Sequence, residues 1–223
     1  KRETARIAFA QAFKKNPATL RVADAYARHA LNTNNRKLAK QTLKTHIAKS
    51  AQHPLSTALM AEIDSGKTPP LLVTSPTDGL AEVFYGIGDA LAGEGGLDMG
   101  IIFLQFALYL EPNLPLAQVA LAEAYDSAKR YDLELTALDN IPQESPLYLN
   151  VQIQKALALN ALEKVDDAKA LLEKVIAQNP KDIRPFDALG NILRSHERYG
   201  EARDAYARAI ALVGKPTKQN WTL

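Results

Sequence analysis

Apolar residues recur along this chain at helical spacing, and small residues recur among them at fixed places. In the stretch 186–210, large apolar residues return every three or four positions. The small residues among them are Gly190, Ala202 and Ala209. The apolar spacing predicts helices, whereas a small residue is needed only where a second helix approaches too closely for a larger side chain. We therefore predict two helices, at about 183–195 and 199–212, packed across a short turn at Glu197 and Arg198.

The same pattern recurs upstream with a period of 34 residues. Four units of this length follow one another without an insertion and together cover residues 81–216. Each unit has a small residue at the same place in its first helix: Gly88, Ala122, Ala156 and Gly190. Internal repetition at such a period predicts a solenoid, in which each repeat buries its apolar face against its neighbours.

The motif residues of the last unit are Phe186, Leu189-Gly190, Leu193, Ala202 and Tyr206. They resemble the tetratricopeptide repeat, a helix–turn–helix unit of 34 residues. The resemblance implies an all-α fold, a right-handed superhelical solenoid. Two departures from the pattern stand out in the second unit, where Glu134 takes the place of the usual Ala and Pro142 falls within the expected second helix. We expect that helix to end near Asn140, because proline inside a helix removes a hydrogen bond and clashes with the preceding turn.

The repeat frame divides the chain into three segments. Residues 1–54 fit degenerate or truncated helices of the same repeat. Residues 55–80 do not repeat, and we expect a short helix from Pro54 to about Ile63, then a Pro-rich loop that acts as a hinge. Residues 81–223 form the regular array, which ends at the start of another first helix.

Charge is strongly segregated along the chain, although the net charge is only +2. Residues 1–53 have a net charge of +10, residues 54–148 of −11, and residues 149–223 of +3. Such segregation can orient a partner, but solvated helix faces would produce the same pattern. The basic segment is the only candidate for nucleic-acid binding. We do not expect that function, because Phe9, Phe13 and Tyr26 point into the core in the repeat frame and could not stack on bases.

Motifs that carry chemistry are absent from the sequence. There is no Cys, and the four His residues have no metal-ligand spacing. The Gly-rich stretch 86–96 lacks the third Gly of a dinucleotide-binding loop, and no strand precedes it. Ser and Thr residues have no neighbouring His and acid that would activate them. We therefore expect no enzyme activity, no cofactor and no metal site.

The resemblance implies a function as well as a fold. Proteins of this family hold a peptide or a domain in a concave groove lined by first helices, which would make this chain a protein-interaction scaffold or adaptor. The alternative is a targeting or regulatory arm of a larger enzyme whose catalytic domain lies outside these residues. The chain looks most like large bacterial proteins of the family, several of which are exported to the cell envelope, with the cytoplasm as the alternative compartment.

The family geometry also implies which residues line the groove. We refer to them as the first-helix wall: Glu82, Tyr85, Asp89, Val119, Glu123, Asp126, Asn150, Ile153 and Leu157. The wall runs from acidic to apolar, so we expect a partner with basic and aliphatic residues. The Lys and Arg that clamp the terminal carboxylate of chaperone tails in other family members have no counterpart at these positions, and we expect no such ligand.

A second surface is predicted on the helix at about 97–110. Ile102, Phe106 and Tyr109 form an apolar stripe in addition to the residues that the repeat needs in its core. A helix that is apolar all round is ordinarily buried on both sides. We expect the Pro-rich loop at 66–78 to cover this stripe, or else a partner or a second copy of the chain in a homodimer.

Overall fold

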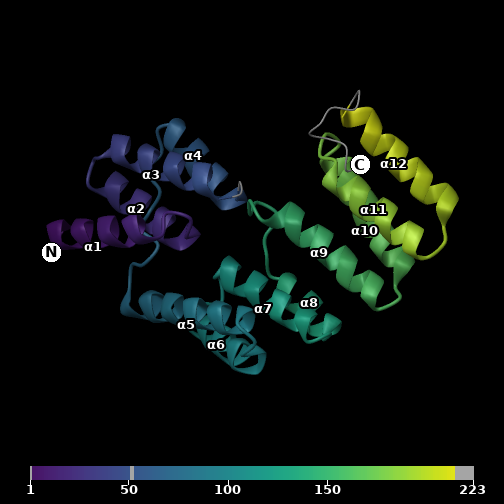
Figure 1. Cartoon of the computed structure of the whole chain (residues 1–223), viewed down its shortest axis with the longest axis horizontal. Coiled ribbons are helices and arrows are strands. Elements are labelled where there is room, and N and C mark those ends of the chain that lie inside the picture. The colour runs from purple at the N-terminus through teal and green to yellow at the C-terminus, as the bar shows by residue number, and fades with distance from the viewer. Residues whose placement is uncertain (1, 51–52, 214–223) are drawn as a thin grey trace. The chain divides into compact units, whose positions relative to one another are not determined.

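The computed structural model describes residues 2–50 and 53–213, and the regular elements there are all helices (Figure 1). These residues form two compact units, one ending at Leu80 and the other beginning at Ala81. The all-α prediction is confirmed. Each unit has its own apolar core, and we describe the two units separately.

The first unit consists of four helices. They are α1 (Arg2–Lys15), α2 (Leu20–Asn32), α3 (Arg36–Lys49) and α4 (Pro54–Asp64). Phe9 and Phe13 of α1 contact the ring of Tyr26 on α2, with ring centroids 6.1 and 6.0 Å apart. Tyr26 is buried, so these aromatic residues serve the core. His46 of α3 is also buried, and its Nδ1 lies 3.0 Å from the carbonyl oxygen of Pro17, which fixes the α1–α2 turn against α3.

The Pro-rich loop that follows α4 is held by side chains of α2 and α3. Arg28 Nη1 donates to the carbonyl oxygen of Pro70 at 3.0 Å, and Asn32 Nδ2 donates to that of Pro69 at 3.1 Å. Arg36 donates to the carbonyl oxygen of Gly66 at 2.9 Å. Because these bonds fix the backbone of the loop, its place is on the helices of the first unit.

Helix α5 (Pro76–Gly93) begins earlier than the Ala81 expected from the repeat frame. Its start is a capping box, in which Ser75 Oγ accepts from the Asp78 backbone N–H at 3.1 Å and the Asp78 carboxylate accepts from the Ser75 N–H at 3.0 Å. Hydrogen bonds from the Ser75 and Thr74 hydroxyl groups hold the pKa of Asp78 well below its usual value. This local motif, which the repeat frame does not include, sets the start of the helix.

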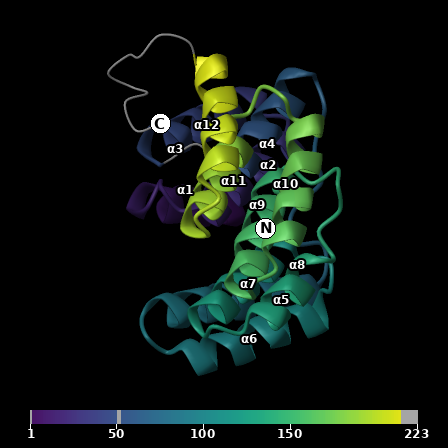
Figure 2. The same ribbon diagram turned by 90° about the vertical axis from the view of Figure 1, so that its right-hand side faces the viewer.

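The second unit is a series of helix pairs, each a first helix followed by a second helix. The pairs are α5 with α6 (Leu97–Leu110), α7 (Pro115–Ser127) with α8 (Tyr131–Leu138), α9 (Tyr148–Ala161) with α10 (Val165–Gln178), and α11 (Arg184–Ser195) with α12 (Tyr199–Val213). Figures 1 and 2 show α9 to α12 side by side. The helices predicted at 183–195 and 199–212 are confirmed as α11 and α12. The first helix expected to begin at residue 220 lies outside the described residues.

The turns inside the helix pairs repeat the period in the backbone. Each has one residue with a positive φ: Gly95, Lys129, Glu163 and Glu197, at 90°, 57°, 60° and 60°. Successive members are 34 positions apart. Only one of these four residues is a glycine. The close approach of the two helices therefore imposes the left-handed conformation, at a modest free-energy cost for the other three residues.

The small residues of the first helices stand where the partner helix is closest. A Cβ atom added at Gly190 would lie 2.5 Å from the Tyr206 ring. One added at Gly88 would lie 2.9 Å from the backbone nitrogen of Leu104, and one added at Gly100 would lie 2.7 Å from that of Ala92. The packing explanation for the small residues is therefore confirmed, and the Gly-rich stretch at 86–96 is the end of α5 and its turn.

Helix α8 is the shortest of the second unit. It ends at Leu138, two residues before the expected Asn140, and the chain then passes through turns to Pro142. The other second helices of the unit have 14 or 15 residues. The truncation predicted from Pro142 is confirmed.

Candidate functional site

Three carboxylates of the first-helix wall, on α5 and α7, are near enough for their charges to interact. We call Asp89, Glu123 and Asp126 the acidic cluster. Burial raises the pKa of the Glu123 carboxyl, and the neighbouring charges of Asp89 and Asp126 raise it further. Burial also raises the pKa of Asp89. The fold therefore brings acids that the sequence separates by a full repeat near enough for their charges to raise the pKa of Glu123.

The acidic cluster has no ion-pair partner among the described residues. Several acids in the last two helix pairs are different, because basic side chains pair with them. Arg198 Nη1 lies 2.7 Å from Asp166, and Arg208 Nη1 lies 2.9 Å from Glu173. Basic side chains therefore neutralise acids of the last two helix pairs, whereas the acidic cluster has no cation beside it among the described residues.

The neutral part of the wall begins at Asn150 on α9. Asn150 Oδ1 accepts a hydrogen bond from Arg184 Nη1 of the next first helix at 2.6 Å. Leu157 is exposed over 48% of its surface. Ile153, however, is half-buried and packs against the core of α9 to α12. Val119 of α7 is also half-buried. Leu157 is therefore the most accessible apolar side chain of this part of the wall.

Glu82 and Tyr85 stand on the first half of α5. Both are half-buried, and both take part in contacts within the fold. Tyr85 packs against the apolar clusters formed by α5, α6 and α7. These two residues are less accessible to a partner than Asp89, one to two turns further along the same helix.

Glu134 is an acid that the wall prediction did not include. It lies on α8 and is only 1% exposed. Its Oε1 accepts a hydrogen bond from Gln154 Nε2 at 3.1 Å, while Oε2 has no hydrogen-bond partner among the described residues. Burial, with a smaller contribution from the charge of Asp126, raises the pKa of Glu134 to about 7 against the lowering effect of the Gln154 bond. The signal in the sequence was the acid at a position where the repeat has Ala.

The apolar stripe predicted on α6 is exposed in the described structure. Ile102, Phe106 and Tyr109 are exposed over 41%, 50% and 84% of their surfaces. The covering of the stripe by the loop at 66–78 stays a prediction, because the loop and α6 belong to different units of the chain. The Phe106 ring contacts the Phe84 ring of α5, with centroids 5.6 Å apart. The use of the stripe by a partner or a second copy stays a prediction.

Neither a metal-binding group nor a membrane-spanning helix is found among the described residues. No group of three or more His, Asp or Glu side chains there is arranged to hold a metal ion. No helix among the residues placed by the structure has both the length and the apolar character needed to cross a membrane.

The chain was compared with known proteins by sequence. No protein-family model matches it. The curated protein high chlorophyll fluorescent 107 of Arabidopsis thaliana is 41% identical over 68 residues, the length of two repeats. The match covers 30% of this chain and 10% of that protein, so the chain spans about a tenth of the length of the curated relative it matches.

Comparison with solved structures gives broader coverage. MamA from Desulfovibrio magneticus RS-1, starting at its residue 41, superposes with a TM-score of 0.52 at 17% identity and covers 88% of this chain and 95% of that one. Another crystal structure of MamA gives a TM-score of 0.53 at 16% identity, with 88% and 92% covered. MamA is itself a tetratricopeptide-repeat protein. With its helix pairs, its 34-residue period and this likeness, the chain has the helical solenoid fold typical of tetratricopeptide repeats.

Proposed function

We propose that the chain is a protein-interaction scaffold whose first-helix wall binds a segment of a partner protein. The carrying observation is the acidic cluster, three neighbouring carboxylates with no cation from the described residues beside them. Burial raises the pKa of Asp89, and burial together with the charges of Asp89 and Asp126 raises that of Glu123, so the ionised form of these acids carries a free-energy cost. A Lys or Arg side chain of a partner would remove it, which favours a basic partner.

The rest of the wall supports a partner that also carries aliphatic residues. Leu157 offers an exposed apolar contact on α9, and Val119 offers a half-buried one on α7, one turn before Glu123. Asn150 is already hydrogen-bonded to Arg184, so it forms a neutral boundary of the proposed binding surface. A segment with Lys or Arg near one end and Leu or Ile near the other matches this order of side chains. Charge would then set the approach and orientation, and apolar contact would add affinity.

The proposal is tested with a pair of labelled peptides. One is a fluorescein-labelled peptide that alternates Lys and Leu, and the other has Glu in place of each Lys. Fluorescence anisotropy is measured with the complete chain at about 20 mM and about 150 mM salt, where the screening length falls from more than 20 to about 8 Å. We expect the Lys peptide to bind, more weakly at the higher salt, and the Glu peptide not to bind.

A charge-reversed variant locates the interaction. Asp89→Lys with Glu123→Lys should weaken binding of the Lys peptide by about tenfold or more and reduce its dependence on salt. The matched control is Glu94→Lys with Asp98→Lys, which changes the net charge equally at the exposed α5–α6 turn. Equal losses in both variants would mean that the overall charge, and not the wall, attracts the peptide. Normal binding by the wall variant would mean that the partner uses another surface.

A further inference from the structure

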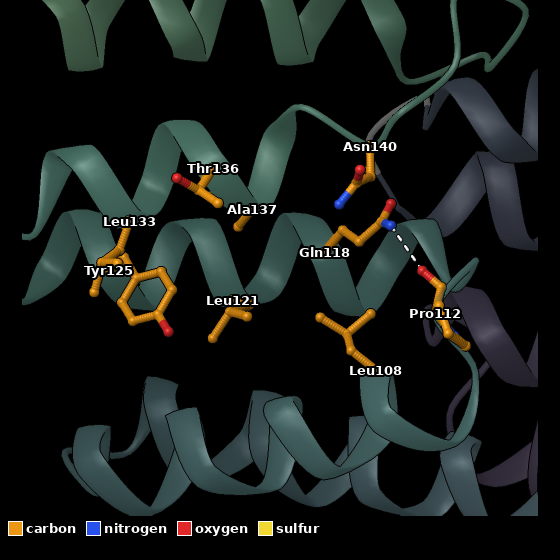
Figure 3. Close-up of a pocket in the computed structure, with 9 residues that line it drawn as sticks. All are labelled: Leu108, Pro112, Gln118, Leu121, Tyr125, Leu133, Thr136, Ala137 and Asn140. Carbon is orange, nitrogen blue, oxygen red and sulfur yellow. Dashed lines mark hydrogen bonds between the residues drawn. The ribbon is translucent and has the colours of Figure 1, made fainter.

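A pocket of about 310 Å³ lies among α6, α7 and α8 (Figure 3). It is lined by Leu108, Pro112, Gln118, Leu121, Tyr125, Leu133, Thr136, Ala137 and Asn140. Leu121 and Tyr125 face it from α7, whereas the acidic cluster uses Glu123 of the same helix. Residues two positions apart on a helix point in nearly opposite directions, so the pocket and the acidic cluster are on different faces of α7.

The short α8 explains why the pocket exists. Helix α8 has 8 residues, whereas α10, at the same place in the next repeat, has 14. The chain leaves the helical path at Asp139, and Asn140 then lines one end of the pocket. The space that a complete second helix would occupy beside α6 is therefore partly open. Pro142 causes the truncation, because its ring cannot continue a helix.

The pocket has an apolar body and a polar end. Leu108, Leu121 and Ala137 form the apolar body, while Figure 3 shows the amide groups of Gln118 and Asn140 together at one end. Gln118 is only 4% exposed. Its Nε2 donates to the carbonyl oxygen of Pro112 at 2.8 Å, which fixes the side chain and leaves Oε1 without a partner among the described residues. The Asn140 amide has no hydrogen-bond partner there either.

This arrangement matches a peptide group attached to an aliphatic side chain. A fixed amide oxygen accepts a backbone N–H, and the Asn140 amide can donate to a backbone carbonyl. The volume is at the lower end of the range of about 300 to 1,000 Å³ for ligand pockets, which suits one or two side chains of a peptide. Asp132 stands beside Leu133 on α8, and residues 54–148 carry a net charge of −11, so an acidic segment is disfavoured. We propose that the α6–α8 pocket binds an extended segment of a protein partner through a Leu- or Ile-sized side chain and its backbone amide.

The experiment uses a small probe and does not require the partner. N-acetyl-leucine N-methylamide is titrated into the complete ¹⁵N-labelled chain, and the side-chain amide signals of Gln118 and Asn140 are followed by NMR. We expect saturable shifts of both signals with a Kd in the millimolar range, as befits so small a ligand. Two further probes separate the parts of the site. N-acetyl-aspartate N-methylamide keeps the peptide groups but not the aliphatic side chain, and 3-methylbutanol keeps the aliphatic part without peptide groups.

A matched pair of variants tests the location. Thr136→Phe places a ring in the mouth of the pocket, and Ser127→Phe makes a similar change on the exposed end of α7. The two hydroxyl groups are equivalent in structure, since each donates to the carbonyl oxygen four residues earlier. We expect at least tenfold weaker binding of the leucine probe to Thr136→Phe and unchanged binding to Ser127→Phe. Binding that survives Thr136→Phe, or no shift of Gln118 and Asn140 in the unmodified chain, would overturn the proposal. Equal binding of 3-methylbutanol would overturn the recognition of the peptide group, and equal binding of the aspartate probe would overturn that of the aliphatic side chain.

Discussion

The buried carboxyl of Glu134 gives a prediction whose size follows from the structure. Glu134 stands on α8, its pKa in the folded chain is about 7, and its ordinary value is 4.5. Between these two pH values the folded chain binds the proton and the unfolded chain does not. The free energy of unfolding must therefore fall as the pH rises through this interval. One pKa unit corresponds to about 1.4 kcal/mol, so the full loss above pH 7 is about 3 kcal/mol.

The variant that tests this is Glu134→Gln. Glutamine has nearly the same shape, keeps an oxygen that accepts from Gln154 Nε2, and cannot ionise. Urea unfolding, followed by far-UV circular dichroism, is measured at about pH 5 and about pH 8. We expect similar stabilities of the variant and the unmodified chain at the lower pH. At the higher pH the variant should be more stable by about 3 kcal/mol, because it leaves no anion buried without a partner.

The ion-paired carboxyl of Glu201 does not obscure the effect. Hydrogen bonds from Arg198 and Lys169 lower the pKa of Glu201 to about 2, so its stabilising contribution is lost only as the pH falls below about 4.5. Glu123→Gln is the control. The pKa of Glu123 is also raised, but the residue as a whole is exposed, so this variant should change the pH dependence of stability less than Glu134→Gln does. Hydrogen exchange of the α8 amides measures the same change locally. The reasoning is refuted if Glu134→Gln has the pH dependence of the unmodified chain, or if it is less stable at both pH values.

Two further predictions concern packing and assembly. Gly100→Ala should destabilise the second unit by about 2 to 3 kcal/mol in urea unfolding, because the new Cβ would lie 2.7 Å from the backbone nitrogen of Ala92 and the helices would have to separate. Gly86→Ala, where nothing lies within 4 Å, should instead stabilise α5 by about 0.5 to 1 kcal/mol, and a loss there as large as at Gly100 would contradict the packing argument. For the α6 stripe, we expect Phe106→Gln with Tyr109→Gln to abolish self-association in sedimentation velocity. A chain that is monomeric at high concentration before mutation would exclude the homodimer.

The helix pairs could be predicted because a repeat is written locally in the sequence. Gly190 and Gly100 are small because the partner helix of the same pair leaves no room for a side chain. The same contact recurs in each repeat, so small residues recur with the period of 34 residues. The effect of Pro142 on α8 was predictable in the same way, since the ring of a proline disrupts its own helix. The start of α5 differed from the frame because Ser75 and Asp78 form a capping box outside it. That motif is also local, and the residues S-x-x-D before the helix were its signal.

Burial and the meeting of distant residues were decided by the tertiary structure. The acidic positions were predictable from the repeat geometry, but the raised pKa values of Asp89 and Glu123 depend on how α5 and α7 pack. Likewise, the hydrogen bond from Arg28 to the carbonyl oxygen of Pro70 joins residues far apart in the sequence, so it depends on the packing of the loop against α2. The truncation of α8 was predictable, but the pocket that Gln118 lines depends on how α6, α7 and α8 pack around that end. A 34-residue period specifies each helix pair, whereas the desolvation and charge of a side chain depend on every helix packed around it.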